Sequence, residues 1–268
     1  MNKFVIIISA LITMPSVLAM KKPVKKSSVQ EPLVKNCPFK LSDKEKKEII
    51  ENRAYFLKTL NEHVKINGGS QQKWFDLRCA NLPKTHLETR FLRFINFSGA
   101  NLDGSDANNA RFEQVNFSNT SVQRVNANSA EFWDVIFDNA NLSHTDFSSG
   151  QILGATKPVS ARNANFSNIN GAAVAMFKNI DFSGSKFNGA HFDTSGLEDI
   201  KIDRKTSFKN TAFTSAILKR WQGAPESNKR ISGSRSRNDS NIKSFLLEQK
   251  ANLTNVTVDG LDTDIPFH

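Results

Sequence analysis

The sequence is poor in the residues that build metal centres and membrane anchors. Its 268 residues include two cysteines and five histidines. Two cysteines are too few for a structural zinc site unless histidines complete the ligand set. Beyond the first residues, no apolar run is long enough to span a bilayer. We therefore expect no metal, no other cofactor and no transmembrane segment.

Acidic residues are also in the minority. Aspartate and glutamate number 26 against 36 lysines and arginines, which gives a formal net charge of +10. The excess is concentrated in residues 20–80, which hold 14 basic and 7 acidic residues, whereas residues 81–219 are close to neutral. Residues 20–41 are expected to form a flexible basic arm. We favour a solvated linker over a contact with anionic lipid or polysaccharide, and we expect no nucleic-acid partner.

The first 19 residues have the features of a secretory signal peptide. The basic start Met1-Asn2-Lys3 precedes an apolar run over residues 4–14, and Val17-Leu18-Ala19 suits a cleavage site. The run is too short for a membrane span. We therefore expect an exported protein, either periplasmic or secreted. In such an oxidising compartment Cys37 and Cys79 are expected to form a disulfide, with two free thiols as the alternative.

The middle of the chain repeats every five residues. From Leu82 to Leu218 an apolar residue recurs at every fifth position and follows a small residue two places earlier. Every fourth unit has a bulky residue in place of the small one, as in Ile95/Phe97. A five-residue unit within a twenty-residue period indicates a coil with four sides. The clearest units are Ala100-Asn101-Leu102, Ala110-Arg111-Phe112, Ala140-Asn141-Leu142, Ala164-Asn165-Phe166 and Ala190-His191-Phe192.

This pattern resembles the pentapeptide-repeat family, whose consensus is Ala, then Asp or Asn, then Leu or Phe, then two variable polar residues. The resemblance covers about half of the chain, residues 81–219, and implies a right-handed quadrilateral β-helix. It implies no activity, because the family shares a scaffold rather than a chemistry. The expected fold class is an all-β solenoid of about seven coils, with an N-terminal α-helix and a short C-terminal helical or strand segment.

Each side of the coil is expected to bury its central residue and the residue two places before it. Residues twenty apart then stack in columns. We name the sides faces A to D in chain order, starting with Leu82 on face A. Large residues on face D lie opposite small ones on face B, and like residues stack: Phe97, Phe117 and Phe137 against Leu87, Ala107 and Ala127. Four inserted residues break the unit at Lys157–Ala161, and single insertions follow between Gly171 and Phe177 and near Arg204-Lys205. The register is expected to survive them.

The segments on either side of the coil are predicted to act as caps. Residues 42–80 begin with the capping box Ser42-Asp43-Lys44-Glu45 and should form a helix to about Asn67. Its apolar stripe is expected to pack over or beside the first coil, with partner binding as the less favoured alternative: Ile49, Phe56, Leu60 and Val64. Residues 220–241 are predicted to be a polar loop. Residues 242–268 are predicted to be a C-terminal cap, in which Val256-Thr257-Val258 repeats the five-residue unit.

A packed lumen leaves only the outer faces and the ends free for chemistry. His86 and His191 share face B but lie five coils apart, so the coil does not bring them to one metal. His144, Asp146 and Ser148 lie near one corner, but local Asp and Ser are ordinary repeat residues, so we expect no catalytic site. The outward acids do not converge as a glycosidase pair would: Asp103, Asp106, Asp134, Asp138, Asp146 and Asp181.

Face C has the unusual outer surface. Its outward positions combine aromatic, apolar and charged residues: Phe91, Arg93, Phe94, Arg111, Glu113, Glu131, Trp133 and Leu153. Face B, in contrast, offers asparagine and serine. A mixed apolar and charged stripe indicates a covered or binding surface. We favour cover by the N-terminal helix or the C-terminal segment, and burial of Trp133 by residues 43–66 would exclude a partner site.

These observations predict a non-enzymatic, exported protein that acts as a rigid binding or structural scaffold, with an unknown protein or envelope component as its partner. The resemblance implies one alternative. Some pentapeptide-repeat proteins bind DNA gyrase by resembling DNA in shape and negative charge, but the neutral coil, the basic arm and the export signal disfavour it here. A carbohydrate-active β-helix enzyme is the other alternative, favoured only by the compartment and the rod shape.

Overall fold

The computed structural model describes residues 31–61, 66–67, 74–173, 175–214, 216–221 and 257–258. The chain divides into two units after Gln30, and every described residue belongs to the second, Glu31–His268. The expected signal peptide, the first half of the basic arm, Val64, and most of the polar loop and the C-terminal cap lie outside the described residues.

One α-helix, α1, runs from Asp43 to Asn61 and starts at the predicted capping box. The Ser42 backbone N–H donates to Glu45 Oε2 at 2.8 Å, and the Glu45 backbone N–H donates to Ser42 Oγ at 3.3 Å. These two bonds satisfy donors that a helix start leaves open. The helix ends before the predicted Asn67, because Ile66–Asn67 already forms strand β1 and pairs with the coil.

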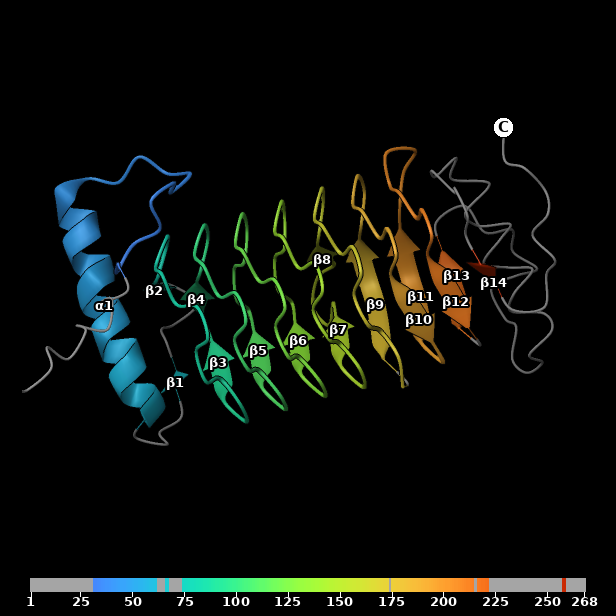
Figure 1. The fold of residues 1–268 in the computed structure, drawn as a ribbon, viewed down its shortest axis with the longest axis horizontal. Coiled ribbons are helices and arrows are strands. Elements are labelled where there is room, and N and C mark those ends of the chain that lie inside the picture. The colour runs from blue at the N-terminus through green and yellow to red at the C-terminus, as the bar shows by residue number, and fades with distance from the viewer. Residues whose placement is uncertain are drawn as a thin grey trace, which may run out of the picture. The chain divides into compact units, whose positions relative to one another are not determined.

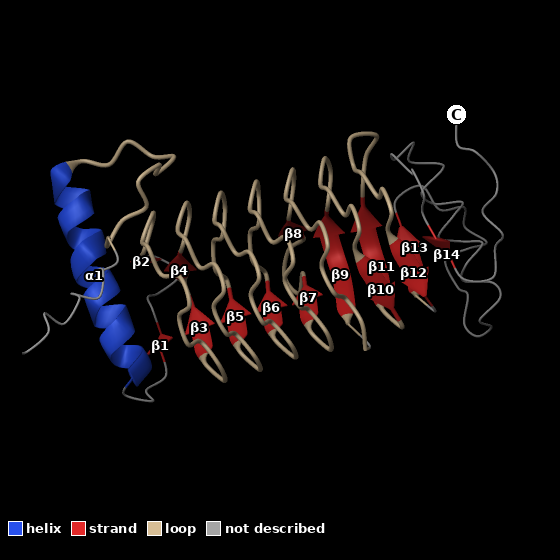
Figure 2. Ribbon diagram, viewed as in Figure 1, coloured by secondary structure: helices blue, strands red, loops and turns tan. Residues whose placement is uncertain are grey.

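From β1 onward the described chain is a coil of short strands whose pairings are all parallel (Figures 1 and 2). The largest sheet has the order β1-β3-β5-β6-β7-β9-β11-β13, with β8 also paired to β9, and smaller sheets join β10-β12-β14 and β2-β4. The strands are β1 Ile66–Asn67, β2 Phe75–Asp76, β3 Phe91–Arg93, β4 Ile95–Asn96, β5 Arg111–Glu113, β6 Glu131–Trp133, β7 Gln151–Leu153, β8 Val159–Ser160, β9 Met176–Asp181, β10 His191–Asp193, β11 Gly196–Lys201, β12 Ala212–Thr214, β13 Ile217–Trp221 and β14 Thr257–Val258.

Parallel pairing begins before the first complete repeat and continues after the last. β1 and β2 lie in residues 42–80 and pair with β3 and β4, so part of a coil precedes Leu82. At the other end β14 pairs with β12, which returns Thr257 and Val258 to the coil.

The register keeps its twenty-residue period, except at the insertions. Phe112 pairs with Phe132, whereas Ile152 pairs with Phe177, as the predicted four-residue insertion and the single extra residue before Phe177 together require. The position of the four-residue insertion was predicted wrongly. Val159 and Ala161 are fully buried face D residues, and the residue between them pairs with the neighbouring coils. The extra residues instead occupy the corner at 154–158, where residues 155–158 are exposed and add no side chain to the lumen.

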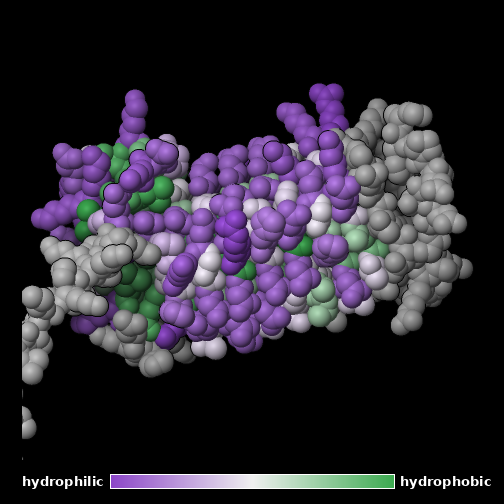
Figure 3. Space-filling model, viewed as in Figure 1, coloured by the Kyte–Doolittle hydropathy of each residue, from purple (hydrophilic) through white to green (hydrophobic). Residues whose placement is uncertain are grey.

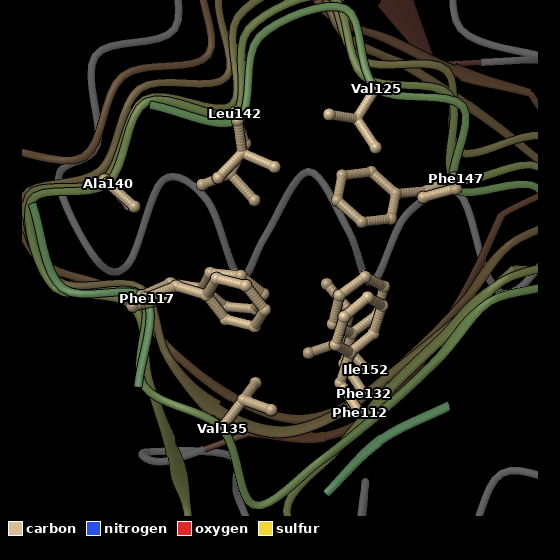
Figure 4. Close-up of a cluster of buried hydrophobic side chains, with 14 of the residues drawn as sticks. Phe112, Phe117, Val125, Phe132, Val135, Ala140, Leu142, Phe147 and Ile152 are labelled. Carbon is tan, nitrogen blue, oxygen red and sulfur yellow. The ribbon is translucent and has the colours of Figure 1, made fainter. Parts of the chain in front are cut away.

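The lumen is filled by side chains that point inward from all four faces (Figure 4). Large and small residues alternate between opposite faces. Face D loses its ring at Ala161, and face B of that coil supplies Phe147 instead. In the next coil face B has Gly171, and face D supplies Phe182. This exchange keeps the volume per coil nearly constant, as close packing requires.

The aromatic stack therefore changes faces along the coil, and the single face D column of the prediction describes only its first half. Stacked rings lie 4.8–5.6 Å apart between centroids, within the range that aromatic pairs favour. The stacks are Phe97–Phe117–Phe137 on face D, Phe112–Phe132 on face C, Phe166–Phe187–Phe208 on face A and Phe192–Phe213 on face B.

Left-handed residues form the corners of the coil. Positive φ recurs every fifth residue through most of the described coil, at 20 non-glycine residues and four glycines. Asn, Asp, Ser and Gly occupy many of these positions because they tolerate this conformation best. The variable polar positions of the repeat are therefore the places where the backbone turns.

The N-terminal end of the coil is closed by side chains from α1. An uncapped end would expose backbone acceptors and an apolar lumen. Asn52 Nδ2 donates to the Asp76 carbonyl at 2.9 Å, and Arg53 Nε donates to the Asn81 carbonyl at 2.8 Å. The apolar stripe of α1 packs on the first coil, as predicted: Ile49, Phe56 and Leu60 are buried in the same core as the lumen residues.

A disulfide ties the segment before α1 to the first coil. Cys37 and Cys79 are joined, with Cα atoms 5.4 Å apart and a sequence separation of 42 residues. Next to this bond, the Val34 N–H donates to the Cys79 carbonyl at 2.8 Å, in a short antiparallel contact. The chain before α1 is thereby held at the edge of the first coil.

Candidate functional site

The candidate site is the outer surface of face C, the side that carries β3, β5, β6, β7, β9 and β11. In β3, β5, β6 and β7 the central residue enters the lumen and the two flanking residues point outward, and residues 176–178 of β9 and 196–198 of β11 follow the same pattern. In-register pairing aligns the outward residues in two columns. The first outer column is Phe91, Arg111, Glu131, Gln151, Met176 and Gly196, and the second outer column is Arg93, Glu113, Trp133, Leu153, Lys178 and Glu198.

Arg111 is the centre of a cluster on this surface. Its guanidinium carbon lies 5.5 Å from the ring centroid of Phe91 and 4.9 Å from that of Trp133. It also pairs with Glu113 at 3.5 Å and with Glu131 at 3.7 Å. Cation–π contacts and paired charges together fix an arginine that still has 45% of its side chain exposed.

Further contacts order the charged side chains around the cluster. Arg93 Nη2 lies 2.9 Å from Glu113 Oε1, and the Trp133 indole N–H donates to Glu131 Oε2 at 3.0 Å. Two coils further along, Lys178 pairs with Glu198 at 3.4 Å. Face C is therefore a pre-arranged surface of mixed charge with half-buried aromatic groups.

Two residues that we expected to point outward are buried at the corner instead. Phe94 is 7% exposed and Asp134 is 4% exposed, and both have positive φ. The left-handed backbone turns these side chains away from the surface. The Phe94 ring lies under the Arg93 guanidinium, 4.5 Å from ring centroid to guanidinium carbon, so Phe94 supports the surface from below.

Asp134 holds the inserted corner loop. Its Oδ1 accepts from the Ala155 N–H at 2.7 Å and from the Thr156 N–H at 3.0 Å, and its Oδ2 accepts from Thr156 Oγ1 at 2.6 Å. Burial alone would raise the pKa of this carboxyl, but the hydrogen bonds from Thr156 and Ala155 hold it below the usual value. Asn179 Nδ2 completes the attachment by donating to the Gly154 carbonyl at 2.9 Å.

The helix does not lie over the centre of face C. α1 stands at the end of the coil next to β1 and β2, whereas β6 and β7 lie several coils further along (Figure 1). Trp133 keeps an intermediate exposure, and its neighbours are Arg111 and Glu131. Cover by α1, one of the two covers that we favoured, is therefore wrong for this part of face C, and cover by the C-terminal segment concerns residues that lie outside the described ones. The surface seen in Figure 3 is mainly hydrophilic, with small separate hydrophobic areas.

The other polar candidates make contacts that support the coil. Ser148 Oγ donates to Asp146, whereas His144 Nε2 lies 3.4 Å from Asn168 Nδ2, so the three residues of the superficial triad are not linked in series. Asp138 pairs with Arg162 of the next coil. Among the residues that the structure describes, no three His, Cys, Asp or Glu side chains could hold a metal ion.

No helix in the described part of the chain has the length and apolar character needed to cross a bilayer.

Comparison with known proteins identifies the repeat. No curated protein matches the sequence. One similar solved structure is the pentapeptide repeat protein HetL of the cyanobacterium Nostoc sp. strain PCC 7120, involved in heterocyst differentiation regulation; it is 22% identical, the match covers 59% of this chain and 84% of HetL, and the TM-score is 0.20. A second is QnrB1, a plasmid-mediated fluoroquinolone resistance protein, with 14% identity, coverage of 65% of this chain and 92% of QnrB1, and a TM-score of 0.25. A third is a pentapeptide repeat protein of the Arabidopsis thaliana thylakoid lumen, with 16% identity, coverage of 63% of this chain and 81% of that protein, and a TM-score of 0.22. The family model of pentapeptide repeats matches residues 95–134 in eight copies. The four-sided coil is thus a right-handed quadrilateral β-helix of about seven turns, and its residues 95–134 are repeats of the pentapeptide-repeat family.

Proposed function

We propose that this chain is a non-enzymatic, exported scaffold and that it binds a protein through face C. The observation that carries the proposal is the Arg111 guanidinium held between the rings of Phe91 and Trp133 on the outside of a packed coil. Arginine and aromatic residues are the types enriched at the centres of protein interfaces. Neighbouring face B presents Asn126 and Asn128 instead.

The scaffold role is supported by the way the coil is packed. Buried side chains from four faces fill the lumen, so binding has to use the outer surface. Each strand of face C pairs with a strand on either side, from β3 to β11. A surface fixed in this way loses little conformational entropy when a partner binds.

Export is supported by the N-terminal sequence and by the disulfide. The bond between Cys37 and Cys79 has a Cα separation of 5.4 Å, within the usual range for disulfides, and such bonds persist in oxidising compartments. The test is to block free thiols with an alkylating reagent while the producing cells are lysed and fractionated. Unmodified cysteines in an exported fraction are the expected result. Alkylated cysteines in the cytoplasmic fraction would contradict export.

Site-specific photocrosslinking tests the binding surface. Trp133 is replaced by p-benzoylphenylalanine in the full chain, and the matched control carries the same group at Asn126, an exposed position on face B. We expect a protein adduct from position 133 and none from position 126 after irradiation of the producing cells. Equal adducts from both positions, or none from position 133, would refute the role of face C.

A further inference from the structure

In the second outer column of face C, the order of charged and apolar side chains is complementary to the same column read in the opposite direction. Along the coil the column runs Arg93, Glu113, Trp133, Leu153, Lys178 and Glu198. In terms of chemistry this order is positive, negative, apolar, apolar, positive, negative. Read from the other end, it is negative, positive, apolar, apolar, negative, positive.

We propose that face C binds face C of a second copy of this chain, with the two coils antiparallel. This inference rests on the proposed function of face C and names its partner. The two-fold axis would lie in the interface, parallel to the strands, between the coils of Trp133 and Leu153. In this arrangement each charge of the column meets an opposite charge, and the Trp133 ring meets Leu153. Residue contacts of this reciprocal kind are what an isologous dimer interface requires.

The charges of the column are available for such contacts. The exposed fractions of the side chains are 36% for Arg93, 20% for Glu113, 41% for Lys178 and 19% for Glu198. Each pairs within its own copy, Arg93 with Glu113 and Lys178 with Glu198. The dimer would join these two ion pairs head to tail into a four-charge network at each end of the interface, where surrounding protein reduces screening.

The first outer column is compatible with the same arrangement. Its reverse places Gly196 opposite Phe91, Met176 opposite Arg111 and Gln151 opposite Glu131. No like charges meet, and Gly196 places no side chain of its own opposite the Phe91 ring.

Charge also selects one register for the two copies. A shift by one coil in either direction brings Arg93 opposite Lys178 or Glu113 opposite Glu198. Juxtaposed like charges are strongly unfavourable at an interface. The register centred between Trp133 and Leu153 avoids both conflicts.

The expected dimer is small and reversible. Six strands at the usual spacing give a contact about 24 Å long, and three residues per strand give a width of about 10 Å. This contact area is smaller than that of stable complexes, so we expect a dissociation constant in the micromolar range or above. The association should weaken as salt is added.

Exchange of paired charges provides the test. Variant X carries Arg93→Glu and Glu113→Arg, and variant Y carries Lys178→Glu and Glu198→Lys, so each keeps the ion pair within its own chain. Variant X also loses the pair between Glu113 and Arg111, so its association is judged by recovery on mixing and not by its loss alone. In a homodimer of X or of Y, like charges meet across the interface at both ends. In a mixed dimer of X with Y, every contact joins opposite charges again. The pattern of charges thus predicts that neither variant dimerises well alone and that the two variants form a mixed dimer.

The measurement is sedimentation equilibrium of the full mature chain with its disulfide intact. We expect a monomer–dimer equilibrium for the wild type, at least about tenfold weaker association for X or Y alone, and recovery in an equimolar mixture. A parallel arrangement would not recover on mixing, because the positive charge that Glu113→Arg introduces in X would still meet Arg111 of Y. A monomeric wild type, or no recovery on mixing folded variants, would overturn the proposal.

A single substitution keeps the test valid if an exchanged variant fails to fold. Leu153→Glu places a carboxylate opposite the partner's Trp133 at a partly exposed position, and Ser121→Glu on face A is the matched control. Only Leu153→Glu should reduce dimerisation. An adduct of position 133 with a different protein, together with a monomeric wild type, would leave the proposed function standing and end the dimer proposal. No adduct at position 133 would end both.

Discussion

Removal of one lumen ring tests the exchange of large and small residues between opposite faces. Phe147 is 1% exposed, and its ring centroid lies 5.8 Å from that of Phe132 and 6.4 Å from that of Phe177. The opposite face of this coil has only Ala161, so Phe147→Ala would leave the coil without a ring on either of these two faces.

The structure places the effect of this substitution in the upper part of the usual range. A buried Phe→Ala change costs about 3–5 kcal/mol, and the value rises with the cavity that remains. The backbone here cannot close on the cavity, because the Phe147 N–H donates to the Asn170 carbonyl at 2.7 Å and the Ala127 N–H donates to the Asp146 carbonyl at 2.8 Å. We therefore expect a loss of about 4–5 kcal/mol in the free energy of unfolding.

Urea denaturation followed by circular dichroism, with the disulfide oxidised, provides the assay. Phe147→Leu is the control and should cost only about 1 kcal/mol. The double variant Phe147→Ala with Ala161→Phe restores one ring to the coil on the opposite face. It should be more stable than Phe147→Ala alone by at least about 1 kcal/mol. A double variant that is less stable than Phe147→Ala would refute the packing argument.

Three further outcomes follow from contacts at the corner and at the cap. Asp134→Ala should speed hydrogen exchange of the Ala155 and Thr156 amides by about 10- to 100-fold, since both donate to this carboxylate, and unchanged exchange measured by NMR would contradict the attachment. Cys79→Ser should lower the free energy of unfolding by about 4 kcal/mol on the chain-entropy model, measured by urea denaturation against the oxidised wild type. Equal stabilities of variant and wild type would argue against a stabilising disulfide. The Ser42 N–H and hydroxyl, with Arg78, lower the pKa of Glu45 to about 2. The stabilisation of the folded state by ionised Glu45 is fully present above pH about 4.3 and is lost as the pH falls towards about 2. Over this window the melting temperature of Glu45→Gln should therefore vary less with pH than that of the wild type.

The repeat made the fold predictable, because each residue twenty positions further meets the same environment. The alignment of His86 and His191 on one face, five coils apart, followed from counting alone and is confirmed by the chain of bridges between them. The insertion after Leu153 was harder to place, because Val159 and Ala161 fit both an inserted loop and a face D unit. Only the strand partners decide between these possibilities.

Residues at the corners were the main source of error on the outer surface. Counting assigns Phe94 and Asp134 to the outside, but it does not give the direction of a side chain on a left-handed residue. For Phe94 the available signal was a bulky ring at a position that elsewhere holds mostly Asn, Asp, Ser or Gly. The contacts of α1 with the carbonyls of the first coil left no pattern in the sequence, because a hydrogen bond to a backbone acceptor specifies no partner residue.

The corner at residues 154–158 shows how such a molecule can acquire new surface without being rebuilt. The chain leaves the coil after Leu153 and re-enters at Val159 with the coils on both sides still aligned. Asp134 and Asn179 anchor the excursion, so its four exposed residues extend from a firm base. A foreign peptide grafted at this corner would be displayed at a fixed height on the rod, with its two ends already held close together.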